Sequence, residues 1–419
     1  MTAKDSTMLK RNRLPHQPEV NIGAIGHVDH GKTTLVEGIT GVWTSAHSEE
    51  LRRGITIKVG YADAAFYKCG KCNPPENYST TSSCPKCGNE AKLSRVVSFV
   101  DTPGHESLMA IMLSGAAVMN GAILIIAANE DVPQPQTREH LLSLQMLGMK
   151  HIVIAQNKLD LVTNQEAERN YKAIQKFAKG TVAENAPIIP VSGHHKLNLD
   201  ALIGAIEESI PTPLTKTKKK PLMQTLRSFD VNRPGMNITQ IRGGVIGGTL
   251  IEGEFNVGEE IVLKPGLLDE KTKKYNAIKT TIASLGTSVG LVKNVKTGGL
   301  IALGTTLDPS ITRADNLLGS VVGLPNELPP VHSSLKIETQ LLDKAVGAPE
   351  MMKVEKIRKG EVLRLNIGTA VTLGPVGSIN GDIISVNLKR PICAALGNRV
   401  AVTRRIADRW RLIGSGIII

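Results

Sequence analysis

The chain has 419 residues, of which 41% are hydrophobic, 21% charged and 3% aromatic. This composition is typical of a globular protein of two to four domains and excludes a disordered or collagen-like chain. The longest apolar stretch, Gly121–Ala128, is too short to span a bilayer, and residues 1–20 lack the apolar segment of a signal peptide. We therefore expect a cytoplasmic protein with no membrane partner.

The net charge of +12 comes entirely from the second half of the chain. Residues 1–211 carry 21 basic and 21 acidic side chains, whereas residues 212–419 carry 29 basic and 17 acidic ones. A basic half of this kind indicates a polyanionic partner, with nucleic acid as the first candidate. The alternative is a solvated basic surface that binds no partner.

The first half alternates apolar runs with helical patterns. The predicted strands are Val20–Ile25, Val96–Val100, Ala122–Ala127, His151–Gln156 and Ile188–Val191. The predicted helices are Lys32–Ile39, Glu106–Met119, Gln136–Leu147, Asn164–Ala178 and Asn198–Ser209. This alternation predicts a parallel sheet with helices on both faces.

The pattern changes after Pro211, where prolines and a run of lysines up to Pro221 predict an extended linker. Beyond it, short β-rich runs separated by Gly, Pro and Asn predict two small β-barrels, divided near Leu328. The predicted fold class is therefore α/β plus all-β, with domains at residues 1–211, 212–328 and 329–419.

The segment Gly26–Thr33 has the G-x4-G-K-[ST] pattern of a phosphate-binding loop between a strand and a helix. The glycines let backbone N–H groups converge on phosphate oxygens, and the helix N-terminus adds partial positive charge. We expect Lys32 to reach the β- and γ-phosphates and the Thr33 hydroxyl to bind Mg²⁺. An ordinary glycine turn is the alternative.

A second motif, Asp101–Gly104, directly follows the predicted strand that ends at Val100. Its position predicts that Asp101 holds Mg²⁺ through water and that the Gly104 N–H meets the γ-phosphate. His105 comes next and is the candidate to position the attacking water. Thr56, between the two motifs, could complete the Mg²⁺ shell when a γ-phosphate is present.

A third motif, Asn157–Asp160, follows the next strand and predicts a choice of base. Asp160 can accept hydrogen bonds from N1–H and the 2-amino group of guanine, whereas adenine would leave the carboxylate without partners. Ser192–His194 could supply a backbone N–H to guanine O6. The three motifs together favour GTP over ATP.

Four of the five cysteines form two C-x2-C pairs: Cys69, Cys72, Cys84 and Cys87. Four thiolates are the number that tetrahedral Zn²⁺ takes, and a closed set leaves no position for substrate, so we predict a structural zinc knuckle at about residues 66–92. An iron centre or a loop without metal is the alternative.

The motifs GHVDHGKTT, RGIT, DTPGH and NKLD together resemble the translational GTPases of the elongation factor Tu class. The four-cysteine insert, and stretches such as IAANEDVPQPQTREHL and LRSFDVNRPG, resemble within that class the gamma subunits of the archaeal and eukaryotic translation initiation factor two. The resemblance covers essentially the whole chain and implies a P-loop GTPase domain with a zinc knuckle insert, followed by two β-barrels.

The resemblance also implies partners and residue roles. The partners are initiator methionyl-tRNA, the small ribosomal subunit, and alpha and beta subunits in a heterotrimer; GTP hydrolysis to GDP would release the tRNA. The implied residues are Asp29, His30, Gly31, Lys32, Thr33 and Thr34 for the phosphates; Asn157, Lys158, Asp160, Ser192, Gly193 and His194 for guanine; Thr33 and Thr56 for Mg²⁺; and Asp29 and Gly54 for a second Mg²⁺. The family usually has Ser-Ala-Leu where this chain has Ser-Gly-His at 192–194.

Two rival functions stay open from the sequence. One is another tRNA-delivering GTPase, such as a selenocysteine-specific elongation factor. The other is a zinc-knuckle adaptor whose nucleotide is only structural, against which the presence of Lys32, Asp101 and His105 argues.

Overall fold

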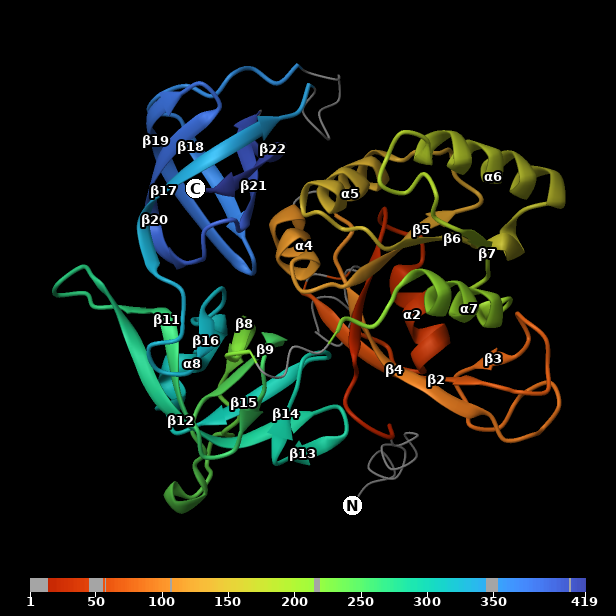
Figure 1. Ribbon diagram of the computed structural model, residues 1–419, viewed down its shortest axis with the longest axis horizontal. Helices are drawn as coiled ribbons and strands as arrows, with labels where there is room; N and C mark the ends of the chain where they lie inside the picture. The colour runs from red at the N-terminus through yellow and green to blue at the C-terminus, as the bar shows by residue number, and fades with distance from the viewer. Residues whose placement is uncertain are drawn as a thin grey trace.

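The computed structural model describes residues 14–44, 56, 58–105, 108–214, 219–343, 353–406 and 408–419. An α/β domain is followed by two β-barrels, as Figure 1 shows from red at the N-terminus to blue at the C-terminus. The predicted fold class is therefore confirmed.

The α/β domain is built on a seven-stranded sheet in the order β3-β2-β4-β1-β5-β6-β7. The strands are β1 (Val20–Ile25), β2 (Gly60–Lys68), β3 (Tyr78–Ser79), β4 (Lys92–Asp101), β5 (Gly121–Ala127), β6 (Ile152–Asn157) and β7 (Ile188–Pro190). Its helices are α2 (Lys32–Thr40), α4 (Met109–Ala116), α5 (Pro135–Met146), α6 (Asn164–Ala178) and α7 (Leu199–Ser209), and a short turn of 3-10 helix, η3, covers Leu159–Leu161.

The five predicted strands form the expected parallel sheet, and two strands that were not predicted add an antiparallel edge. Strands β4, β1, β5, β6 and β7 are parallel, but β2 runs antiparallel to β4, with Gly60 opposite Asp101, and β3 runs antiparallel to β2. A long antiparallel pair can be closed by a turn without a crossover helix. The four-cysteine segment lies at that turn.

The central strands are buried on both sides, which explains their continuous apolar runs. Every residue of β1, β5 and β6 is buried. One face of the sheet packs against α2 and α7, and the other packs against α4, α5 and α6. Because β1, β4, β5 and β6 are parallel, the residues that follow them meet at one edge.

The first barrel contains β8 (Leu222–Phe229), β9 (Val245–Glu252), β11 (Glu260–Leu268), β12 (Tyr275–Thr287), β15 (Ile301–Thr305) and β16 (Val321–Gly323), and its sheet closes through the pairing of β11 with β12. The short strands β10 (Phe255–Asn256), β13 (Gly290–Val292) and β14 (Asn294–Val295), the helix α8 (Pro309–Thr312) and the 3-10 turns η4 (Ile238–Gln240) and η5 (Arg313–Asp315) complete this part.

The second barrel is closed in the order β17-β20-β19-β18-β21-β22. Its strands are β17 (Val331–Leu341), β18 (Val362–Ile367), β19 (Ala370–Asn380), β20 (Ile383–Cys393), β21 (Arg399–Ile406) and β22 (Arg409–Ile418). Each barrel encloses its own hydrophobic core.

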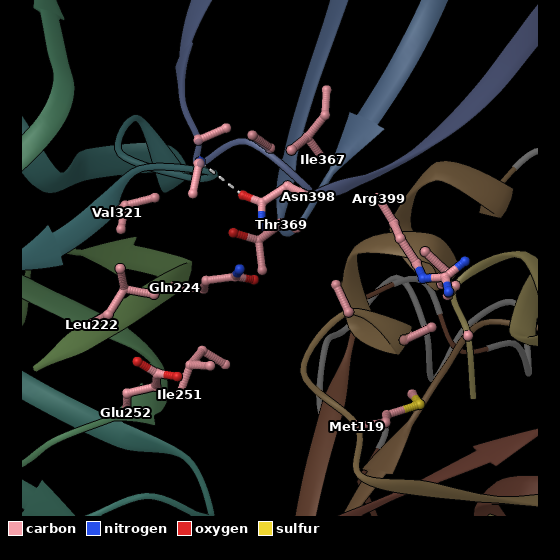
Figure 2. Close-up of a pocket in the computed structure, with 18 of the residues that line it drawn as sticks. Met119, Leu222, Gln224, Ile251, Glu252, Val321, Ile367, Thr369, Asn398 and Arg399 are labelled. Atoms are coloured by element: carbon pink, nitrogen blue, oxygen red, sulfur yellow. Dashed lines mark hydrogen bonds between the residues drawn. The ribbon is translucent and has the colours of Figure 1, made fainter. Parts of the chain in front are cut away.

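A cavity of about 640 Å³ lies where the three parts of the chain meet. Figure 2 shows Gln224 of the first barrel and Thr369 of the second barrel beside it, with Met119 of the α/β domain on the opposite wall. Among the described helices, none is long and apolar enough to cross a membrane.

Candidate nucleotide site and cysteine knuckle

The loop between β1 and α2 has the backbone of a phosphate cradle. Gly26, Asp29 and Gly31 all have positive φ, at 145°, 62° and 83°, and α2 begins at Lys32 with no side chain capping its first N–H groups. Uncapped N–H groups at a helix N-terminus, with the partial positive charge of the helix, attract anions. The loop can therefore receive phosphate oxygens without rebuilding the helix end.

Lys32 is 7% exposed, and its ammonium Nζ donates a hydrogen bond to the His27 carbonyl over 2.6 Å. Burial lowers its pKa to about 8, although Asp101 and Asp29 oppose the shift. A Cβ on Gly104 would lie 2.4 Å from this Nζ and 2.9 Å from the Gly26 carbonyl oxygen. The structure thus packs the Asp101–Gly104 segment against the loop, and only glycine fits there.

Three oxygen-bearing side chains that the sequence assigns to Mg²⁺ lie together. The Thr33 hydroxyl donates to Asp101 Oδ2 over 2.7 Å and lies 3.1 Å from the Thr56 hydroxyl. Thr44, which the sequence reasoning missed, donates to the same carboxylate oxygen over 2.6 Å. Hydroxyl and carboxylate oxygens are the donors that Mg²⁺ prefers, so this cluster fits the ion.

The base-recognition segments are joined to each other and to the loop. Asn157 is 2% exposed; its Nδ2 donates to the His30 carbonyl, and its Oδ1 accepts the Gly193 N–H at 2.9 Å. The Ser192 hydroxyl donates to Asp160 Oδ1 over 2.5 Å, and this bond holds the pKa of Asp160 below its usual value. An ionised carboxylate here is the acceptor that guanine requires.

The remaining predicted site residues differ in how exposed they are. Asp29, His105 and His194 are exposed, Thr34 is half-buried on α2, and Lys158 has a positive φ of 64° just before η3. His30 is fully buried, and its ring contacts the Ile125 carbonyl oxygen through Nδ1 at 3.0 Å and Glu130 through Nε2 at 3.3 Å. Gly54 lies outside the described residues.

Two histidines that the sequence reasoning did not single out also border the site. His140 is 1% exposed and accepts a hydrogen bond from the Gly26 N–H. His195 Nε2 lies 3.8 Å from Asp160 Oδ2. The adjacent pair His194-His195 is a sequence signal that could have pointed to His195. No local pattern marks His140, because its partner Gly26 is more than a hundred residues away.

The four cysteines of the knuckle converge as predicted from their spacing. All four sulfur atoms lie within 4.8 Å of one another, with Cys69 to Cys87 at 3.6 Å and Cys72 to Cys84 at 3.7 Å. Sulfurs bound at about 2.3 Å to a tetrahedral Zn²⁺ stand about 3.8 Å apart. The cluster therefore fits zinc, and none of the five cysteines forms a disulfide.

The fold and this edge of the sheet define a P-loop GTPase of the translational class. In agreement, the family model "Elongation factor Tu GTP binding domain" matches residues 17–212, and "Initiation factor eIF2 gamma, C terminal" matches residues 333–418.

The chain is 55% identical to the translation initiation factor 2 subunit gamma of Archaeoglobus fulgidus, over 96% of this chain and 94% of that one. It is 53% identical to the same subunit of Methanocaldococcus jannaschii, over 98% and 100% of the two chains. The chain therefore belongs to the family of translation initiation factor 2 gamma subunits and is a translational GTPase.

The solved structure of a bacterial selenocysteine-specific elongation factor shares the fold, with a TM-score of 0.72 and 23% identity, covering 96% of this chain and 58% of that chain. The elongation factor SelB of Methanococcus maripaludis has a TM-score of 0.69 at 20% identity, over 97% and 80% of the chains. At these identities the likeness concerns the fold alone. The named relatives favour an initiation factor over a selenocysteine-specific elongation factor.

Proposed function

We propose that this chain binds GTP at the edge formed by β1, β4 and β6 and carries initiator methionyl-tRNA to the small ribosomal subunit in the cytoplasm. It would act as the gamma subunit of a heterotrimer with alpha and beta subunits, and GTP hydrolysis to GDP would release the tRNA. The division into domains at about residues 211 and 328 belongs to this proposal. The convergence of Thr33, Thr56 and Asp101 beside Lys32 carries the nucleotide part of it.

Each predicted site residue has a proposed role. The loop from Asp29 to Thr34 binds the phosphates, with Lys32 as the cation and Gly104 at the γ-phosphate. Asn157 and Lys158 hold the base pocket, Asp160 accepts from guanine, and one backbone N–H of the segment 192–194 meets O6. Thr33, Thr56 and Asp101 hold Mg²⁺, which when bound neutralises phosphate charge; Asp29 and Gly54 would serve a second ion. Cys69, Cys72, Cys84 and Cys87 hold a structural zinc.

His105 is the proposed catalytic residue, because it follows the residue that faces the γ-phosphate and could orient the attacking water. A single-turnover hydrolysis assay of His105→Ala, with ribosomes and partner subunits present, tests this role. We expect hydrolysis to slow at least tenfold while GTP binding changes little. An unchanged rate would remove His105 from the mechanism.

The experiment that tests the whole function is tRNA binding by the purified chain with a GTP analogue or GDP, before and after the alpha and beta subunits are added. Moving from mostly released to mostly bound requires about a 10⁴-fold difference in affinity between the two nucleotide states. We expect the analogue to favour binding and added salt to weaken it. A tRNA affinity that is the same with the GTP analogue and with GDP, or binding of ATP as tight as that of GTP, would refute the proposal. Either result would favour the zinc-knuckle adaptor.

A further inference from the structure

A buried histidine from α5 contacts the first residue of the phosphate loop. The His140 ring is 1% exposed, and its Nδ1 accepts a hydrogen bond from the Gly26 N–H over 3.1 Å. The bond joins α5 to the point where the chain leaves β1 and turns into the loop. It is separate from the contacts of Lys32, Thr33 and Asp101 described above.

The loop approaches the rest of the domain closely at this point. A Cβ on Gly26 would lie 2.3 Å from the Ile125 carbonyl oxygen of β5, so the glycine sits directly against the neighbouring strand. Near the other end of the loop, His30 Nδ1 lies 3.0 Å from the same oxygen, and the His30 carbonyl accepts from Asn157 Nδ2 over 3.0 Å. On the entry side of the loop, His140 is the residue of α5 that bonds the Gly26 backbone.

The direction of the hydrogen bond determines the state of the ring. A backbone amide can only donate, so Nδ1 of His140 must be the acceptor and a neutral ring must carry its proton on Nε2. Burial lowers the pKa of His140 to about 3, and the nearby Lys32, His27 and His30 lower it further. The ring is therefore neutral at physiological pH.

We propose that His140 is a positioning residue of the phosphate loop, whose Nδ1 holds the Gly26 amide in the orientation in which the loop receives phosphate. The inference rests on the proposed binding of GTP and GDP at this edge. His140 touches no reacting atom and acts through the backbone of Gly26.

The test measures the Kd for fluorescent GDP in full-length variants of His140. The substituted side chains differ in where they place a hydrogen-bond acceptor. Asn puts an oxygen where Nδ1 stands, Gln puts one where Nε2 stands, and Leu offers none. We expect His140→Leu and His140→Gln to raise the Kd for GDP about tenfold, and His140→Asn to stay within about threefold of the unchanged protein. A tenfold rise in Kd corresponds to the free energy of about one lost hydrogen bond.

Ser143→Ala is the matched control on the same helix, because its buried hydroxyl donates to the Glu139 carbonyl within α5 and not to the loop. Its Kd should not change. Equal affinities for the Leu, Gln and Asn variants would overturn the role of His140 while leaving the proposed function intact. A wild-type chain that binds no GDP would overturn both. If the Leu variant does not fold, the Asn–Gln pair still decides.

Discussion

The two barrels are attached to the GTPase domain in different ways. The first barrel is held by polar bonds near the chain's entry into β1: Gly299 N–H donates to Asn21 Oδ1 over 2.7 Å, and Gln17 donates to the Gly298 carbonyl. A further ion pair joins Lys58 Nζ to Asp315 Oδ2 at 3.0 Å, with the lysine side chain 39% exposed. These contacts are polar, and only some of them are buried.

The second barrel shares a hydrophobic core with the GTPase domain. Ala401 and Leu412 belong to the same buried cluster as α4, α5 and α6, and the second barrel lies beside α4 and α5 (Figure 1). Arg411 on β22 lies 3.5 Å from Glu139 on α5, and both side chains are less than 10% exposed. This interface resembles the interior of a domain.

The contrast between the two interfaces indicates which barrel can move relative to the GTPase domain. Polar bonds can be exchanged for bonds to water at a small net cost, whereas separating a shared core exposes apolar surface. Lys58 is also only two residues from Thr56, a proposed Mg²⁺ ligand. We therefore expect the second barrel to stay with α4 and α5 and the first barrel to respond to the nucleotide site.

The largest effect is expected from Leu412→Ala, which removes a 2% exposed side chain from the shared core. Truncating a buried leucine costs about 4 kcal/mol, from lost burial and the cavity left behind. Urea unfolding followed by Trp410 fluorescence, in a Trp43→Phe background, measures it. The control Leu396→Ala, at a 69% exposed position, should change stability by less than about 0.5 kcal/mol. Equal losses would mean that no shared core exists.

Arg411→Met should cost about 3 kcal/mol, because it leaves the Glu139 carboxylate buried without its cation. Burial already raises the pKa of Glu139 to about 7, although Arg411 opposes the shift. A carboxyl whose folded pKa is raised loses stability as pH rises through that value. The deficit of the variant should therefore be larger at pH 9 than at pH 6 in the same unfolding assay. A deficit independent of pH would contradict this account.

Two buried histidines lie near the phosphate loop, His30 in the loop itself and His140 on α5. Burial lowers the pKa of His30 to about 4 and of His140 to about 3, so the unfolded chain takes up protons below pH 6.5 that the folded chain does not. Stability is full above pH 6.5 and should fall by about 1.4 kcal/mol per pH unit for each histidine on acidification. His140→Asn should remove one such contribution from the slope, with the exposed His195→Gln as control. An unaltered slope in the Asn variant would count against it.

The smallest effect is expected from Lys58→Met at the first-barrel interface. A half-exposed ion pair contributes about 0 to 1 kcal/mol, so global stability should hardly change. Comparison with Arg411→Met tests the contrast directly, since each change removes one cation from an interdomain pair. A loss as large as that of Arg411→Met would show that the two interfaces are equally tight.

Local patterns in the sequence predicted the buried central strands and the amphipathic helix α6. Strands β1, β5 and β6 and helix α6 were placed to within a residue or two, because strand and helix periods are properties of neighbouring residues. The antiparallel edge was missed for two reasons. The segment Gly60–Lys68 contains no β-branched residue, and the cysteine insert separates it in sequence from its partner strand β4. The helix expected at Glu106–Met119 ends earlier, since α4 (Met109–Ala116) stops three residues before Met119.

The fold class, the candidate loop with Lys32 and Thr33, and the four thiols can be predicted from residue order, because each follows from spacing along the chain. The contacts of His140 with Gly26, of Thr44 with Asp101 and of Glu139 with Arg411 become visible in the folded molecule alone. Those contacts join residues far apart in the chain, and they form only when packing of the sheet and barrels has placed the backbones beside each other. The same packing decides which polar groups are buried, and therefore which pKa values shift.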